Sequence, residues 1–176
     1  MKRLFSVLLA GMLVWHALPA VRAEGGIPPK ISAANAVLMD AGTGRVLWEK
    51  DAHTPRLIAS TTKLMTALVA LESGHRLDEV VTIAPEWTGA EGSSLYLRPG
   101  EEVTLEALLY GLLLRSGNDA ALAVAGHCGG TVEDFVTLMN RKARELGMEQ
   151  SAFANPNGLN AEGHYSTAYD MALLAR

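Results

Sequence analysis

The residues best suited to chemistry are Ser60 and Lys63, which stand three positions apart at the start of an apolar stretch that runs to Gly74. The leucines of this stretch recur at three- and four-residue spacing, which predicts a helix, and residues i and i+3 share a helix face. A serine hydroxyl is a weak nucleophile until a base removes its proton. Lysine can be that base if its pKa falls toward neutrality, and burial and positive potential both lower a lysine pKa. We expect the helix to begin at Ser60, so that its positive end lies beside Lys63 and its N–H groups can hold an oxyanion.

A second group of polar residues, Ser116-Gly117-Asn118, interrupts two strongly apolar segments. A break of this kind holds polar side chains at the rim of a cleft, where Ser116 could relay a proton between Lys63 and a leaving amine. Asn118 could orient a peptide substrate. Each group has a simple alternative: a solvated lysine beside a capping serine in the first case, and an ordinary helix–helix turn in the second.

Other chemically capable side chains have simpler explanations. We expect His164 to fix a loop, and the polarity of Ser93 and Ser94 is explained equally well by a loop or by the rim of a cleft. Trp48 and Trp87 are expected to pack against the protein rather than to bind sugars.

The elements that position these residues follow from hydrophobic periodicity and from turn and capping signals. The order predicts a mixed α and β protein with a helical lobe. The expected elements are a hairpin of residues 36–39 and 45–48 around a turn at 40–44, a helix from Ser60 to Gly74, a strand at 80–83, a loop at 86–100 ending in an Arg98-Pro99-Gly100 turn, helices capped by Thr104, Thr131 and Thr167, a helical segment at 120–125 ending at Gly129-Gly130, and a turn at 155–158.

Composition restricts the class of protein. The 176 residues are 49% hydrophobic and 19% charged, which is enough apolar material for a packed core. The net charge of -4 gives no basic surface for nucleic acid, so no nucleic-acid partner is expected. The single cysteine, Cys128, follows His127 but has no nearby residues in the sequence that complete a metal set, and we expect it to be a small buried side chain.

The N-terminus has the pattern of a secretory signal peptide. Lys2 and Arg3 precede an apolar run from Leu4 to Leu18, and Val21-Arg22-Ala23 places small residues where a signal peptidase cleaves. The sequence therefore predicts a signal peptide at residues 1–23, a flexible lead-in at 24–34 and an exported protein. An uncleaved membrane anchor is the alternative.

Taken together and in this order, the motifs resemble the penicillin-binding fold, whose signatures are S-x-x-K, S-D-N and K-T-G. The S-G-N variant of this chain resembles the low-molecular-weight D-alanyl-D-alanine carboxypeptidases of serine peptidase family S11. Three blocks carry the resemblance: AVLMDAGTGRVLWEKDAHTPRLIASTTKLMTALVALE, LRPGEEVTLEALLYGLLLRSGNDAALAVA and NPNGLNAEGHYSTAYDMALLAR. The resemblance implies a penicillin-binding/β-lactamase-like transpeptidase fold, with an antiparallel sheet flanked by helices and a helical lobe.

The resemblance also implies the roles of four residues. Ser60 would form an acyl-enzyme with a peptidoglycan stem peptide ending in D-Ala-D-Ala, with Lys63 as general base and Ser116 assisting proton transfer. Asn118 would bind substrate and help position the lysine. Penicillins and other β-lactams would acylate the same serine, and no metal or organic cofactor is implied. The expected location is the periplasm or the outer face of the bacterial cytoplasmic membrane.

The sequence departs from the family pattern in one respect, because K-T-G is absent. In the family this triplet lies on a later sheet strand, so residues 35–176 are expected to be the N-terminal part of the catalytic domain, with the C-terminal strands outside it. Members of the family often end in a β-rich domain and an amphipathic helix, which implies a membrane-surface association through a region outside this sequence. The alternatives are an inactive fragment, a noncatalytic peptidoglycan-binding module, and a serine β-lactamase.

Overall fold

The hairpin predicted near the N-terminus is present in the computed structural model, which describes residues 30–176. Strands β1 (Ala36–Met39) and β2 (Val46–Lys50) pair antiparallel, with Ala36 opposite Lys50. The Asp40 carboxylate closes the connecting turn by accepting a hydrogen bond from the Thr43 backbone N–H at 2.8 Å. The predicted signal peptide and most of the predicted lead-in lie outside the described residues.

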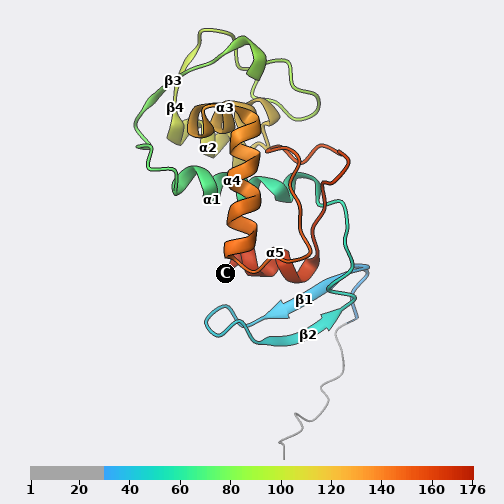
Figure 1. The fold of residues 1–176 in the computed structure, drawn as a ribbon. Coiled ribbons are helices and arrows are strands. Elements are labelled where there is room, and N and C mark those ends of the chain that lie inside the picture. Colours follow the sequence, from blue (N-terminus) through green and yellow to red (C-terminus); the bar gives the residue numbers. More distant parts are fainter. Residues whose placement is uncertain (1–29) are drawn as a thin grey trace, which may run out of the picture. The chain divides into compact units, whose positions relative to one another are not determined.

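Five α-helices follow the hairpin in the described part of the chain (Figure 1). The three threonines predicted as caps each accept a hydrogen bond from the backbone N–H three residues on, which confirms those predictions. The helices are α1 (Thr62–Leu71), α2 (Leu105–Leu114), α3 (Asn118–Gly129), α4 (Val132–Glu145) and α5 (Ala168–Ala175), with short 3₁₀ turns at η1 (Ala59–Thr61) and η2 (Pro85–Trp87).

The predicted bounds of the first helix are wrong at both ends. Ser60 lies in the 3₁₀ turn η1 rather than at the helix cap, and α1 begins at Thr62 and ends at Leu71 instead of Gly74. The last turn is replaced by a tight reversal in which Gly74 has φ of +86°, a backbone conformation that glycine adopts without steric cost. As a result, the nucleophile candidate stands on a turn in front of the helix, whereas Lys63 lies in its first turn.

A second two-stranded ladder joins segments that are distant in the sequence. Strand β3 (Val80–Thr82), predicted as a strand, pairs antiparallel with β4 (Glu102–Thr104). Thr104 was predicted as a cap, but β4 was not predicted as a strand, because only one of its three residues, Val103, is apolar and its partner strand lies on the far side of a long loop. The predicted turn before β4 is confirmed, with the Glu101 N–H donating to the Arg98 carbonyl at 3.0 Å.

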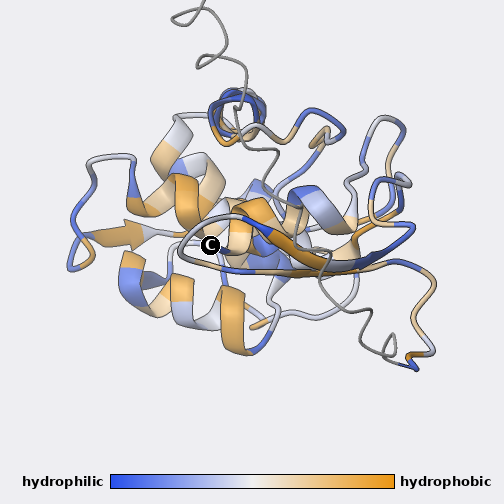
Figure 2. Ribbon diagram, turned by 90° about the horizontal axis from the view of Figure 1, so that it is seen from below, coloured by the Kyte–Doolittle hydropathy of each residue, from blue (hydrophilic) through white to orange (hydrophobic). Residues whose placement is uncertain are grey.

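The core lies around α3, which packs against α1, α2 and α4. Its inward residues are mostly alanines, so neighbouring helices can approach closely. Those alanines and Val124 are fully buried. The covering helix α4 places Phe135 and Met139 in this core and its charged residues outside, and Figure 2 shows the alternation of hydrophobic and hydrophilic residues along the helices.

Helix α5 packs against β1, so the hairpin has a helix on one face (Figure 1). This arrangement of small antiparallel sheets with helices confirms the predicted mixed architecture. Within residues 30–176, none of the helices combines the length and the apolar character needed to cross a membrane.

Candidate active site

Ser60 is held on a strained turn that projects it from the protein surface. The preceding residue, Ala59, has φ of +46°, which is unusual for a residue other than glycine. The turn at 155–158 packs directly onto it: the Gly158 backbone lies so close to the Ala59 carbonyl that a side chain at Gly158 would collide with that oxygen. Ser60 is therefore exposed, and its backbone packs against the turn at 155–158, which is distant in the sequence.

Lys63 is the opposite case, a lysine that is only 3% exposed. Its Nζ donates hydrogen bonds to Asn118 Oδ1 at 2.7 Å and to the Asn157 carbonyl oxygen at 2.6 Å. Both partners are neutral acceptors, so neither adds a charge that would favour the ammonium form. Burial lowers the pKa of Lys63 below its ordinary value of 10.5. The structure therefore supplies the burial that the sequence analysis named as one route to a neutral lysine.

Ser116 and Asn118 lie in the predicted break between two helices. Helix α2 ends at Leu114, and Ser116 has φ of +56°, a conformation that costs a residue with a side chain about 1–3 kcal/mol. Backbone hydrogen bonds of the next two residues hold Ser116 in this conformation. The Gly117 N–H donates to the Gly111 carbonyl at 3.2 Å, and the Asn118 N–H donates to the Ser93 carbonyl at 2.7 Å. Such strain is typical of functional sites, where the surrounding structure holds a side chain in one orientation.

Three of the four predicted residues line one hollow of about 290 Å³. Ser60 and Lys63 reach it from the η1–α1 segment, and Ser116 reaches it from the end of α2. The full lining consists of Ser60, Thr61, Lys63, Leu64, Leu112, Leu113 and Ser116. This set places a hydroxyl, an amine of lowered pKa and a second hydroxyl around the same space, and these are the kinds of group that acyl transfer through a serine ester uses.

Asn118 does not line this hollow and instead lies behind the lysine. Its Oδ1 accepts the hydrogen bond from Lys63, and its Nδ2 donates to the Glu91 carbonyl at 2.5 Å. Both ends of the amide are therefore occupied by the protein, and the contact seen here is one that positions Lys63. Binding of substrate by Asn118 stays a prediction.

Two residues that support the site were missed by the sequence analysis. The Asn157 carbonyl holds Lys63, and Asp119 holds the 94–97 loop by accepting hydrogen bonds from Ser94 Oγ at 2.6 Å and from the Leu97 N–H at 3.0 Å. Burial raises the pKa of Asp119, but these hydrogen bonds outweigh burial and bring the pKa below the usual 3.8. A backbone carbonyl has no signature in a sequence, whereas the acidic residue directly after S-G-N was a signal that could have been used.

His164 fixes a loop, as predicted. Its Nε2 is 2.8 Å from Thr62 Oγ1, and its Nδ1 accepts a hydrogen bond from the Ala154 N–H at 3.1 Å. Burial lowers the pKa of His164, in keeping with the neutral ring that this acceptor role requires. The imidazole thus ties the loop that carries Asn157 to the first turn of α1.

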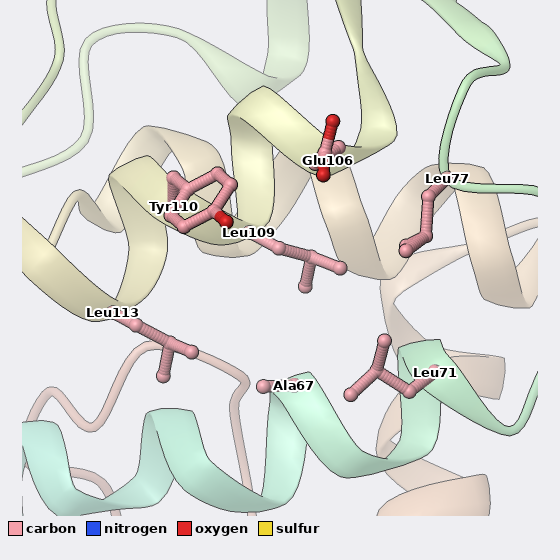
Figure 3. Close-up of a pocket in the computed structure, with 7 residues that line it drawn as sticks. All are labelled: Ala67, Leu71, Leu77, Glu106, Leu109, Tyr110 and Leu113. Carbon is pink, nitrogen blue, oxygen red and sulfur yellow. The ribbon is translucent and has the colours of Figure 1, made fainter.

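A second hollow lies between α1 and α2 but has a different chemical character (Figure 3). Leucines at positions 71, 109 and 113 point into it, and Tyr110 and Glu106 lie at its edge. It contains no pair of nucleophile and base comparable to Ser60 and Lys63. The predicted site residues line the neighbouring hollow instead, which shares Leu113 with this one.

Comparisons with known proteins identify the family of this chain. The family model for peptidase S11, described as D-alanyl-D-alanine carboxypeptidase, matches residues 22–176. The D-alanyl-D-alanine carboxypeptidase DacF of Bacillus subtilis is 41% identical over 184 residues, covering 100% of this chain and 47% of DacF. DacD of Escherichia coli K12 is 41% identical over 160 residues, covering 85% of this chain and 41% of DacD.

Solved structures show the same relationship. The D-alanyl-D-alanine carboxypeptidase DacD of Francisella tularensis superposes with a TM-score of 0.80 at 36% identity, covering 92% of this chain and 41% of that one. Penicillin binding protein 6B of Escherichia coli gives a TM-score of 0.82 at 35% identity, covering 87% of this chain and 51% of that one. The chain thus spans about half the length of the curated relatives it matches, and it belongs to the peptidase S11 family of D-alanyl-D-alanine carboxypeptidases.

Proposed function

We propose that this protein is a serine-type D-Ala-D-Ala carboxypeptidase that removes the terminal D-alanine from peptidoglycan stem pentapeptides. The observation that carries the proposal is the shared hollow that is lined by Ser60, by Ser116 and by a buried Lys63 with a lowered pKa. The names of the relatives supply the substrate class, since they are D-alanyl-D-alanine carboxypeptidases and a penicillin binding protein.

In the first half of the reaction, Ser60 Oγ attacks the carbonyl carbon of the penultimate D-alanine. Neutral Lys63 takes the hydroxyl proton, and Asn118 and the Asn157 carbonyl hold its amine in place. The peptide C–N bond then breaks, and the leaving amine of D-alanine receives a proton from Lys63 through the Ser116 hydroxyl. The products of this half are free D-alanine and an ester on Ser60.

In the second half, water attacks the ester carbonyl, and a proton passes from the water to Lys63. The C–O bond to Ser60 breaks, the serine oxygen regains its proton, and the shortened stem peptide leaves. Penicillins present a strained amide to the same serine, so they would form a comparable ester that persists. These side chains act without a bound cofactor in this scheme.

We further propose that the protein acts outside the cytoplasmic membrane, where peptidoglycan is exposed. The motivation is the N-terminal charge and hydropathy pattern of residues 1–23. Sequencing the N-terminus of the protein recovered from cells tests this point: cleavage after Ala23 is expected, and a retained Met1 would favour the membrane-anchor alternative. Association with the membrane surface through a C-terminal region is a separate proposal, tested by fractionation of the full-length product.

The decisive experiment measures covalent labelling by a fluorescent penicillin and release of D-alanine from a D-Ala-D-Ala peptide. Because the chain spans about half of its relatives' length, the assay uses the full product of the coding region. Ser60→Ala is expected to abolish both activities, whereas Ser32→Ala, at an exposed serine, should leave both unchanged. Labelling that survives Ser60→Ala would refute the assignment. Rapid turnover of the penicillin adduct would indicate a β-lactamase, and a folded protein with neither activity would indicate a noncatalytic binding module.

A further inference from the structure

We propose that His75, Glu79 and His127 form a binding site for Zn²⁺ or a similar divalent transition-metal ion. His75 and Glu79 belong to the loop between α1 and β3, and His127 belongs to the last part of α3. The two histidines are 52 residues apart in the sequence, with β3, β4, α2 and most of α3 between them, so the group exists only in the folded protein.

The three candidate ligand atoms converge on one point. His75 Nδ1 lies 2.8 Å from Glu79 Oε2, and His127 Nε2 lies 3.1 Å from the same oxygen. All three ligand atoms are within 4.8 Å of one another, and the two imidazole rings lie side by side with their centroids 4.6 Å apart. Ligands at about 2.0–2.2 Å from a tetrahedral zinc ion are roughly 3.4 Å from each other, so an ion would enter with changes of no more than about 1.4 Å in the distances between the ligand atoms.

The backbone around this group is already held in place. The Leu105 N–H donates to the Glu79 carbonyl at 2.9 Å, and the Glu106 N–H donates to the Leu77 carbonyl at 2.9 Å. These bonds anchor the loop to the start of α2. The site therefore does not depend on an otherwise free loop, and little ordering would be needed on binding.

The carboxylate also has a supporting partner of its own. Glu79 Oε1 accepts a hydrogen bond from the Arg76 backbone N–H at 2.9 Å, which leaves Oε2 for the histidines. That bond holds the carboxylate in the orientation in which Oε2 faces the two imidazoles. Outer partners of this kind orient metal ligands and increase their affinity.

The ligand set selects the type of ion. Two imidazole nitrogens and one carboxylate oxygen suit zinc and neighbouring transition metals, whereas magnesium and calcium prefer oxygen ligands alone. The three side chains are 22–34% exposed, which leaves a path for the ion and room for water as a fourth ligand. Neutral histidines would bind through the nitrogens that now face the carboxylate, with the ring protons on the other nitrogens or released to solvent.

The metal site would be independent of the proposed catalytic site. Asn118 and His127 are nine residues apart on α3, which corresponds to about 14 Å along the helix axis. A bound ion would therefore not contact Lys63, and its effect would be to tie the loop before β3 to the end of α3. Metal binding to the folded state raises thermal stability by mass action.

Zinc titration of the purified protein, prepared without a histidine tag and followed by calorimetry at neutral pH, tests the proposal. We expect saturation at one Zn²⁺ per chain, no competition by excess Mg²⁺, and a higher melting temperature with zinc. His127→Ala and Glu79→Gln should each weaken binding by more than the 10–100-fold typical of losing an outer partner. The glutamine variant keeps a hydrogen-bonding amide beside the histidines, so it separates metal binding from the role of a hydrogen-bonded cluster.

The chain offers a matched control in His53 and Glu49, an exposed histidine–glutamate pair 3.7 Å apart that has no third ligand among residues 30–176. His53→Ala should leave the zinc affinity unchanged. The proposal would be overturned if the wild-type protein binds no zinc, or if zinc binds with the same affinity after His127→Ala and Glu79→Gln in proteins whose circular dichroism is that of the wild type.

Discussion

Replacing Asn118 by aspartate tests directly whether Lys63 acts as a base. In the structure the Lys63 amine donates to Asn118 Oδ1 at 2.7 Å, and burial lowers the lysine pKa. Asn118→Asp nearly preserves the shape of the side chain but puts a carboxylate at hydrogen-bonding distance from the amine. A neighbouring negative charge favours the ammonium form, so the substitution must raise the pKa of Lys63.

The size of the effect follows from that distance. An opposite charge within about 4–6 Å changes a pKa by about 1–3 pH units. Below its pKa, the neutral fraction of a lysine falls tenfold for each pH unit by which that pKa rises. Acylation of Ser60 should therefore be about 10- to 1,000-fold slower at neutral pH in Asn118→Asp, and the rise of the rate with pH should move to higher pH. Raising the pH should recover much of the lost rate.

The assay is the second-order rate constant for acylation by a labelled penicillin, measured across pH for the wild type, Asn118→Asp and Asn118→Ala. The alanine variant also loses the hydrogen bonds to Lys63 and to the Glu91 carbonyl, but it adds no charge. It should slow acylation without moving the pH profile to higher pH. Identical profiles for the two variants would refute the assignment of Lys63 as the base.

Two further substitutions test the support of the site. Gly158 has φ of +87° and lies against the Ala59 carbonyl, so Gly158→Ala should destabilise the protein by about 1–3 kcal/mol in urea unfolding and should slow acylation. Gly163 has φ of +75° but free space around it, so Gly163→Ala should lower the stability without slowing acylation. Equal acylation rates in the two variants would contradict the proposed support of Ser60. Asp119→Asn should lower the free energy of unfolding at neutral pH by about 2–4 kcal/mol, because an amide cannot accept all the hydrogen bonds of the carboxylate. Since the folded-state pKa of Asp119 is lowered, its contribution to the free energy of unfolding is present above pH 4 and is lost as the pH falls further. The variant should therefore lose less stability in acid than the wild type, and an unchanged acid dependence would contradict this account.

Much of the fold was predictable because its signals are local. A cap needs a threonine and the backbone three residues on, and a hairpin needs two short apolar runs around a turn, so both can be read from neighbouring residues. The start of α1 was not predicted correctly, since the 3₁₀ turn at Ser60 depends on the packing of Gly158 against Ala59. Strand β4 was missed for the same reason, because its partner lies on the far side of a long loop.

The sequence by itself determined which residues could do the chemistry. The spacing of Ser60 and Lys63 is a weak signal by itself, but together with Ser116-Gly117-Asn118 and the three blocks that resemble the S11 family it predicted a serine nucleophile with a lysine base. The physical reason is that a three-residue spacing brings two side chains to the same side of the backbone in a 3₁₀ turn as well as in an α-helix, so the pair is preserved although Ser60 lies in η1 and Lys63 in α1.

Only the tertiary structure decided the environment of those residues. Lys63 is buried and bonded to Asn118 and to the Asn157 carbonyl, partners 55 and 94 residues away in the sequence. The same is true of His75, Glu79 and His127, which meet although 48 residues separate Glu79 from His127. Burial and contacts between distant segments arise from how the helices pack, and these contacts set the pKa of Lys63 and bring the metal-ligand candidates together.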